Sequence, residues 1–314
     1  MNNDLVLKEF NSQIKKIKSD KYSGSVRILN ETISALYNFL EKEKDLDEKD
    51  LIYLLRTSIK SIVETHNQFS ALDHFYNEAI LSMEDFIEKK DNAEKAEGKV
   101  SSLQNYLISI TSDYIEKWNN VNRKIAELAD KTYDFRDKTV LIHSNSNTIL
   151  ALFEYLKEKN IFPEVIQTEA RPKFEGRVLA EQLAQMGFKV NMIVDSAMIK
   201  YLTKVDIALI GCDCIFPDFF INKIGSMPLA LGCKRMNVPL YVLSDSRKLS
   251  KQTQIKPEKR KSPGEVWHTS IPNIHIENYY FETIPNEFIT KLVTESYALE
   301  GNKISLQFDN LITG

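Results

Sequence analysis

The chain has 314 residues and a mass of 36.2 kDa, which exceeds a usual single-domain core and predicts two domains or one large α/β unit. Hydrophobic residues make up 43% and charged residues 27%, a globular composition that excludes global disorder. The 41 Lys and Arg residues against 44 Asp and Glu residues give a net charge of −3. This charge supplies no global positive field for nucleic acid, and we expect no direct nucleic-acid binding.

Residues 1–130 are expected to form a helical domain. All nine prolines lie at or beyond Pro163, and only Gly24 and Gly98 precede residue 130, so this part lacks the residues that punctuate turns. Apolar residues recur at helical spacing in stripes that begin at Leu7, Leu29 and Leu51, and in a long last stripe over 100–128.

No apolar run reaches the roughly 18 residues of a membrane span, and the start MNNDLVLKEF does not resemble a secretory leader. We therefore expect a cytoplasmic protein.

Residues 131–314 are expected to form a Rossmann-like domain with a mostly parallel β-sheet. Short apolar runs alternate with amphipathic segments, the pattern of βαβ units. The expected strands are 139–143, 164–168, 189–194, 205–210 and 239–243, with helices near 147–157, 176–186 and 226–235. Ligands of such sheets bind beyond the carboxyl ends of the strands, so the loops that follow these strands should converge.

Those strand ends are polar: HSNSN follows at 143–147, EARPKFEGR at 169–177, GCD at 211–213, NKIGS at 222–226 and SDSRK at 244–248. SNS and EGR precede expected helices, whose N-terminal backbone donors favour an anion. Positive charge is available from Arg171, Lys173, Arg177, Lys223, Arg247 and Lys248. The pattern favours a phosphorylated small molecule over a polymer.

Each candidate residue also has a plainer interpretation. Ser144 and Ser146 are as readily helix caps as ligand contacts. His143 at a strand end is more often a structural hydrogen-bonding residue than an acid or base. Asn222 with Lys223 can form a tight turn with a solvated lysine. Asp213 is harder to dismiss, because a carboxylate that closes an apolar strand needs a partner or a ligand.

The three cysteines, Cys212, Cys214 and Cys233, are too few and too close together for a disulfide framework. Alternation along a strand would put the sulfurs of Cys212 and Cys214 on one face. A zinc site is weakly indicated because no second paired cluster supplies the remaining ligands. Small buried apolar side chains are the favoured interpretation, and we expect neither a metal nor a cofactor.

Several longer runs resemble one known family. They are TEARPKFEGRVLAEQLAQMGFKVNMIVDSA at 168–197, GCD at 211–213, INKIGSMPLAL at 221–231 and NVPLYVLSDSRKL at 237–249, together with YSGSVRILNETISAL at 22–36, THNQFSALDHFYN at 65–77 and IPNEFITKLVTE at 284–295. The family joins the alpha, beta and delta regulatory subunits of translation initiation factor 2B with isomerases of methylthioribose-1-phosphate and ribose-1,5-bisphosphate. The resemblance implies a helical N-terminal domain and a Rossmann-like domain that pairs as a homodimer or related heterodimer.

The resemblance separates catalytic from binding residues. Where the isomerases carry a catalytic cysteine this chain has Ser144, as the alpha subunit does, and an unassisted hydroxyl does not ionise near neutrality as a thiol can. Asp213 matches the isomerases' catalytic aspartate. Asn222 and Lys223 match the substrate-contacting pair. The remaining implied ligand contacts are Ser23, Gly24, Ser25, Arg27, His143, Asn145, Arg171 and Lys248, with Ser23 replacing the arginine that precedes the glycine in the isomerases.

Three functions follow as hypotheses. The first is a subunit-like protein that binds a sugar phosphate or nucleotide monophosphate with weak or no catalysis. The second is an aldose–ketose isomerase in which Asp213 exchanges a proton with a sugar oxygen while Ser144, helped by His143 or water, replaces the thiol. The third is a scaffold that contacts an initiation factor or another protein through the N-terminal helices.

Overall fold

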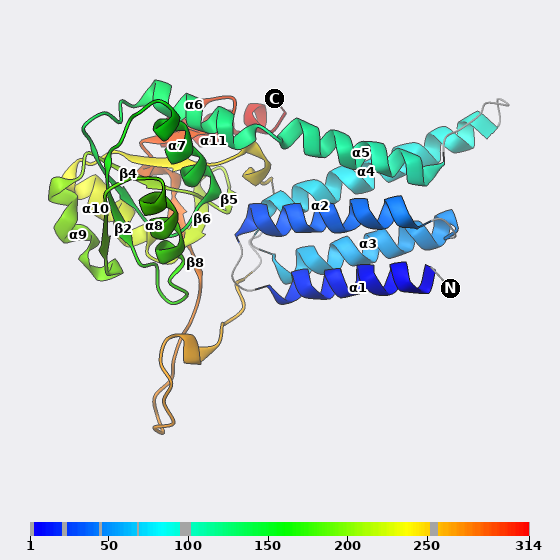
Figure 1. Ribbon diagram of the computed structural model, residues 1–314, viewed down its shortest axis with the longest axis horizontal. Coiled ribbons are helices and arrows are strands. Elements are labelled where there is room, and N and C mark those ends of the chain that lie inside the picture. The colour runs from blue at the N-terminus through cyan, green and yellow to red at the C-terminus, as the bar shows by residue number, and fades with distance from the viewer. Residues whose placement is uncertain are drawn as a thin grey trace. The chain divides into compact units, whose positions relative to one another are not determined.

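The computed structural model describes residues 3–20, 24–43, 46–67, 69–94, 102–251 and 257–313, which form two compact units, Met1–Asn120 and Val121–Gly314 (Figure 1). The second unit begins with helix α6, Val121–Thr132. The expected long stripe over 100–128 is therefore divided between α5 and α6, which belong to different units. That residues 1–130 and 131–314 fold as separate domains stays a prediction.

The first unit is helical, as the scarcity of glycine and proline predicts. Its described helices are α1 (Asn3–Ser19), α2 (Ser25–Lys42), α3 (Glu48–Thr65), α4 (Ser70–Glu94) and α5 (Leu103–Trp118). Side-chain caps start two of them: Asp47 accepts from the Asp50 N–H at α3, and Ser102 accepts from the Asn105 N–H at α5. No helix among the described ranges is long and apolar enough to cross a membrane.

The second unit contains a seven-stranded sheet in the order β10-β9-β7-β4-β1-β2-β3, which confirms the Rossmann-like fold class. The strands are β1 (Thr139–Ile142), β2 (Glu164–Thr168), β3 (Val190–Ile193), β4 (Ile207–Ile210), β7 (Leu240–Leu243), β9 (Lys291–Val293) and β10 (Ala298–Leu299). All neighbours pair in parallel except β10, which is antiparallel to β9. The carboxyl ends of the parallel strands therefore share one edge.

A second, antiparallel sheet was not expected from the sequence. It has the order β5-β6-β8, with β5 Cys214–Ile215, β6 Phe219–Lys223 and β8 Phe281–Pro285. Asn222 and Lys223 are thus the last residues of a strand, and both are buried. The interpretation of these two residues as a tight turn with a solvated lysine is therefore wrong. The strand was overlooked because its apolar part, FFI, is short and follows a proline.

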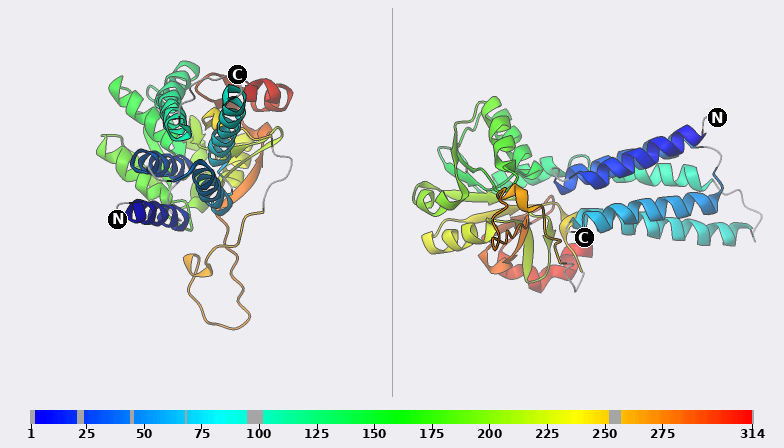
Figure 2. Two further views of the ribbon diagram at one scale, coloured as in Figure 1. Left: turned by 90° about the vertical axis from the view of Figure 1, so that its right-hand side faces the viewer. Right: turned by 90° about the horizontal axis from the view of Figure 1, so that it is seen from below.

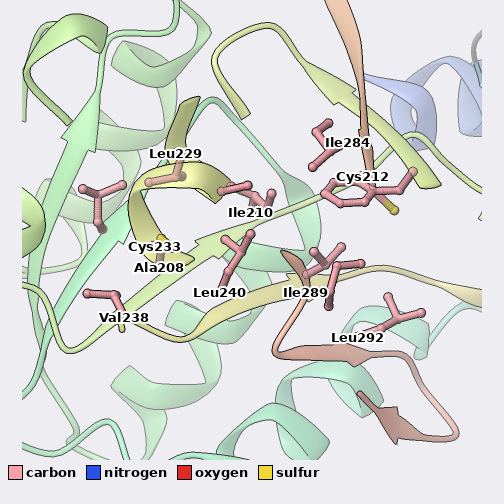
Figure 3. Packing of buried hydrophobic residues seen from close by; sticks show 14 of the residues in the cluster. Ala208, Ile210, Cys212, Leu229, Cys233, Val238, Leu240, Ile284, Ile289 and Leu292 are labelled. Carbon is pink, nitrogen blue, oxygen red and sulfur yellow. The ribbon is translucent and has the colours of Figure 1, made fainter. Parts of the chain in front are cut away.

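Helices cover both faces of the seven-stranded sheet (Figure 2). On one face, α9 (Met198–Tyr201), α10 (Ser226–Met236) and α11 (Gly301–Thr313) bury Met198, Leu229 and Ile304 against alternate strand residues. Figure 3 shows this core, in which Ala208, Ile210 and Leu240 face Leu229 and Cys233. Helices α6, α7 (Asn147–Glu158) and α8 (Glu175–Gln185) pack on one another and on the opposite face. Burial of alternate residues on both faces explains the continuous apolar strands.

The first turn of α8 lies against the end of β2, and this contact depends on a glycine. A Cβ added at Gly176 would lie 1.9 Å from the backbone oxygen of Thr168, which cannot move aside without displacing the strand. At Gly24, before α2, an added Cβ meets nothing within 4 Å. A side chain at position 176 would therefore clash with the backbone of β2, whereas a side chain at position 24 would meet no obstacle.

We predict that Gly176→Ala lowers the free energy of unfolding by about 1–3 kcal/mol, because overpacking forces the backbone to shift. Gly24→Ser is the matched control, since serine is a good N-cap and should change this free energy by less than about 0.5 kcal/mol. Urea unfolding followed by circular dichroism measures both. Equal stability of the two variants would contradict the packing described for Gly176.

Candidate functional site

His143 follows β1 and joins three segments at the strand ends. It is only 1% exposed; its ring Nδ1 lies 2.7 Å from the Thr168 hydroxyl, and its Nε2 lies 2.8 Å from the Ile224 carbonyl oxygen. A carbonyl only accepts, so Nε2 carries the proton and donates to Ile224, while Nδ1 accepts from Thr168. Burial lowers the pKa of His143 below its ordinary value. Both nitrogens are engaged in a neutral ring, which agrees with the structural interpretation of this histidine.

Ser144 occupies an unusual backbone position next to His143. Its φ is 70°, in the left-handed region that costs energy for a residue with a side chain. Its carbonyl accepts from the Gln167 amide at 2.9 Å, and within the described part of the chain its hydroxyl makes no hydrogen bond. Asn145 beside it is exposed. Ser144 is therefore not a helix cap, and its hydroxyl is available to a ligand.

Ser146, by contrast, is the N-cap residue of α7, although its hydroxyl does not cap the backbone. The hydroxyl lies 2.7 Å from that of Thr148, which donates to the Leu243 carbonyl at the end of β7. A Cβ added at Gly211 would lie 2.6 Å from the Ser146 hydroxyl oxygen. These contacts bring the loops after β1, β4 and β7 together.

The loop after β2 is held by the loop after β3. Asp195 accepts hydrogen bonds from the backbone N–H groups of Ala170 and Arg171, at 2.8 and 2.7 Å. The Arg171 guanidinium donates to the Val266 carbonyl at 2.9 Å and lies 4.8 Å from the centre of the Phe174 ring. Arg171 is thus oriented by its own protein rather than free in a loop.

Lys223 brings buried positive charge to the same loop. It is 5% exposed, its Nζ lies 2.7 Å from a Glu175 carboxylate oxygen and 5.0 Å from the centre of the Tyr280 ring. The other Glu175 carboxylate oxygen is buried and has no hydrogen-bond partner among the residues that the structure describes. Neighbouring Asn222 donates to the Ser226 hydroxyl at 2.8 Å. Lys223 is therefore a buried ammonium that is paired with one carboxylate.

Asp213 lies between β4 and β5, where its backbone N–H donates to the Ile221 carbonyl at 2.9 Å. This bond aligns it with the end of β6, which carries Asn222 and Lys223. Lys248, 5% exposed, donates to the Cys212 carbonyl at 2.6 Å. Asp213 is half-buried at this junction.

A buried ion pair that was not predicted from the sequence directly follows β7. The Arg247 Nε donates to Asp245 at 2.9 Å, and both side chains are almost fully buried. Burial raises the pKa of the Asp245 carboxyl, but the charges of Arg247 and Lys248 outweigh this effect and lower it overall. The signal that could have found this pair is the alternation of charges in SDSRK after an apolar strand.

Contacts therefore link the loops that carry Ser144, Arg171, Asp213, Lys223 and Lys248 into one strand-end cluster. Gln167, Glu175, Glu265 and Tyr280 also belong to it, although sequence reasoning did not select them. Gln167 has the sequence context of an ordinary strand residue, and Glu265 and Tyr280 lie outside every quoted motif. Their roles are visible only once the chain is folded.

The N-terminal candidates lie in the first unit. Gly24 precedes α2 with a φ of −74°, which any residue adopts; Ser25 is buried, and Arg27 pairs with Glu31 at 3.1 Å. The backbone conformation at position 24 therefore does not require a glycine. Ser23 lies outside the described residues. A contribution of these four residues to the strand-end cluster stays a prediction.

The cysteines occupy different surroundings. Cys212 and Cys233 lie in the core of the seven-stranded sheet, where burial raises the pKa of each thiol to about 12, whereas Cys214 packs with Phe216 and Ile221. The expectation that Cys212 and Cys214 share one face is wrong, because a loop separates β4 from β5. In the ranges that the structure describes, no three His, Cys, Asp or Glu residues are grouped to hold a metal ion.

The chain belongs to the initiation factor 2 subunit family, whose model matches residues 21–300. It is 27% identical over 296 residues to a ribose 1,5-bisphosphate isomerase from Archaeoglobus fulgidus, covering 90% of this chain and 87% of that protein. It is also 27% identical over 286 residues to a putative translation initiation factor eIF-2B subunit 2-like protein from Pyrococcus abyssi, covering 90% and 93%. The fold resembles the crystal structure of the translation initiation factor eIF-2B from Pyrococcus horikoshii, with a TM-score of 0.74 at 22% identity, covering 93% and 96%. Relatives with enzyme names and with subunit names are thus equally similar.

The buried neutral His143 predicts a pH dependence of stability. Its folded-state pKa lies below its unfolded value of about 6.5, so protons favour the unfolded chain. The free energy of unfolding should fall as pH drops below about 6.5, by at most about 1.4 kcal/mol per pH unit from this group. His143→Gln should remove this contribution.

Denaturant unfolding of both proteins between pH 5 and pH 8 checks the prediction. Above pH 7.5 the difference in the free energy of unfolding between the two proteins measures only the cost of the hydrogen bonds that the variant loses. An identical pH slope in the two proteins would show that His143 takes up its proton as readily in the folded state.

Proposed function

We propose that the protein is a subunit-like member of its family that binds a sugar phosphate or a nucleotide monophosphate at the strand-end cluster, with weak or no catalysis. The proposal is supported by the cations of this cluster in a chain of negative net charge: Lys223 and Lys248 are buried, and Arg171 is oriented by contacts of its backbone and its guanidinium. In the proposed complex the ligand phosphate would share the Lys223 ammonium with Glu175, its partner in this structure. A phosphate group would supply charge and several acceptor oxygens at once.

The case against efficient catalysis depends on one observation, the engagement of both His143 nitrogens. Ser144 has an available hydroxyl, but a hydroxyl needs a neighbouring base to act in proton transfer. Nδ1 of His143 already accepts from Thr168, and burial disfavours the protonated ring. The isomerase hypothesis in which His143 assists Ser144 therefore loses its base.

The alternative function is an aldose–ketose isomerase of a phosphorylated pentose that uses Asp213. It is favoured by the position of Asp213 beside the end of β6, and by the similarity to proteins named ribose 1,5-bisphosphate isomerase. In this case Asp213 alone would serve as the acid–base group: it would give a proton to the ring oxygen as the ring opens and take one from the C2 hydroxyl, while the hydrogen on C2 moves with its electron pair to C1. Loss of one acid–base group costs about 10²–10⁴ in rate, so such an enzyme would be slow.

We predict that ribose-1,5-bisphosphate and adenosine monophosphate, tested separately, raise the melting temperature of the wild-type protein in at least one case, because a ligand of the folded state adds stability. Lys223→Gln should weaken that binding by about 30-fold or more, since a charged group in a buried pair contributes about 2–5 kcal/mol. Isothermal titration calorimetry measures the affinities.

Lys234→Gln is the matched control, since Lys234 is an exposed lysine paired with Glu287 on the surface. Its affinity should equal that of the wild type. Absence of stabilisation by both compounds at millimolar concentration would leave the scaffold hypothesis. Equal affinities of Lys223→Gln and Lys234→Gln would contradict the assigned role of Lys223.

We further predict that Ser144→Cys gains or increases isomerase activity on ribose-1,5-bisphosphate, because a thiol with a pKa of about 8.5 ionises near neutrality. NMR detection of the ketose product measures turnover. The double variant Ser144→Cys with Asp213→Asn should lose the gain. Turnover by the wild-type protein as fast as by Ser144→Cys would overturn the proposal of weak or no catalysis.

A further inference from the structure

Residues 257–280, called the arm below, lead into β8 and are drawn in orange in Figure 1. The last residue of the arm, Tyr280, is buried and joined to the strand-end cluster. Its carbonyl accepts from the N–H of Ile224, the residue after Lys223, at 2.7 Å. Its own N–H donates to the Glu258 carboxylate at 3.0 Å. The backbone of Tyr280 is therefore fixed through both of its polar groups.

The aromatic ring of Tyr280 lies against two ammonium groups. The Nζ atoms of Lys223 and Lys261 each lie 5.0 Å from the ring centre. The face of an aromatic ring attracts a cation, and the attraction is stronger where water is excluded. Lys223 is buried, whereas the Lys261 side chain is 25% exposed and also pairs with Glu258 at 3.3 Å. The ring therefore contributes more to holding Lys223 than to holding Lys261.

The hydroxyl end of the Tyr280 ring is held by Glu265. The Glu265 carboxylate accepts from the Tyr280 hydroxyl and from the Asn278 amide, the latter at 2.9 Å, and it pairs with Lys173 at 3.3 Å. Burial raises the pKa of the Glu265 carboxyl, but these bonds outweigh the effect of burial and lower the pKa overall. Glu265 is therefore ionised at neutral pH and remains an acceptor for the Tyr280 hydroxyl.

These contacts form a network that begins in the loop after β2 and returns to the adjoining start of α8. Lys173 in this loop pairs with Glu265, which accepts from the Tyr280 hydroxyl. The Tyr280 ring lies against Lys223. Lys223 in turn pairs with Glu175, the first residue of α8, at 2.7 Å. The Lys223 ammonium is thus held by two groups, a carboxylate of α8 and an aromatic ring at the end of the arm.

We propose that Tyr280 is a positioning residue of the ligand site: its ring, oriented by Glu265, holds the Lys223 ammonium where a ligand phosphate can share it. The inference rests on the proposed binding function and adds a residue that acts on the ligand only through Lys223. Lysine carries its charge on a flexible four-carbon stem. Fixing that stem before the ligand arrives lowers the entropic cost of binding.

Isothermal titration calorimetry with ribose-1,5-bisphosphate and with adenosine monophosphate tests the proposal. For the compound that the wild type binds, Tyr280→Leu should weaken binding about tenfold, the effect of losing a cation–π contact that is shielded from water. Tyr280→Phe keeps the ring and should recover most of the affinity. Tyr279→Leu, at the exposed neighbouring tyrosine, is the matched control and should bind like the wild type.

Two further variants separate positioning from charge and from a general loss of structure. Removing the negative charge of Glu265 would strengthen anion binding if charge alone mattered. Because Glu265 orients the ring, Glu265→Gln should instead weaken binding, whereas Glu277→Gln, at an exposed glutamate of the arm, should not. In the Lys223→Gln background, Tyr280→Leu should have no further effect on affinity, since residues that act through one contact are not additive.

NMR of protein with carbon-13 at the lysine ε position tests the geometry without a ligand. The Lys223 signal, assigned with Lys223→Gln, should move when Tyr280→Leu removes the ring and should move little in Tyr280→Phe. An unchanged Lys223 signal in Tyr280→Leu would overturn the proposal. Circular dichroism checks the fold of each variant, and Glu265→Gln provides a test that leaves the buried ring in place.

The outcomes distinguish this proposal from the function on which it rests. Absence of binding of both compounds to the wild type would overturn the two together. Binding that Lys223→Gln weakens but Tyr280→Leu leaves intact would overturn the role of Tyr280 alone. Tighter binding by Glu265→Gln would show that Glu265 acts on the ligand through its charge, which would contradict its assigned part in orienting the ring.

Discussion

The strand-end cluster depends on the two hydrogen bonds of the His143 ring. One joins the end of β1 to Thr168 at the end of β2, and the other reaches Ile224, in the turn between β6 and α10. Gly225 in that turn lies so close that a Cβ would be 2.6 Å from the ring, so the turn and the ring are packed as one. Through this contact the small antiparallel sheet is fixed to the parallel sheet, and Asn222 and Lys223 reach the cluster.

The same contact constrains the chemistry. A ring that donates to a carbonyl and accepts from a hydroxyl has no free nitrogen, and burial makes its protonation costly. The other charged groups of the cluster are cations that are held in place: Lys223 by Glu175, Lys173 by Glu265 and Lys248 by a backbone carbonyl. This arrangement supports the proposal that the cluster binds an anion with weak or no catalysis. This is why a binding function is preferred although relatives with isomerase names are as similar as those with subunit names.

Much of the fold could be predicted from local patterns. Apolar runs marked β1, β2, β4 and β7 to within one or two residues, because strands buried on both faces are short and continuously apolar. The small sheet β5-β6-β8 could not be found, since its strands are brief and β8 lies far along the chain from β6. The polar strand ends were visible as motifs, but Glu265 and Tyr280 had no local signal. The orientation of His143 depends on Ile224, which is 81 residues away.

The most direct test of this account is the protonation state of His143, measured by NMR of protein with nitrogen-15-labelled histidine, with the His143→Gln variant to assign the signals. The account predicts a mostly neutral ring at pH 6.5 and a neutral ring with the proton on Nε2 from there to pH 8, with and without ribose-1,5-bisphosphate. A ring that is mostly doubly protonated at pH 6.5, or that carries its proton on Nδ1 when the sugar phosphate is present, would contradict it.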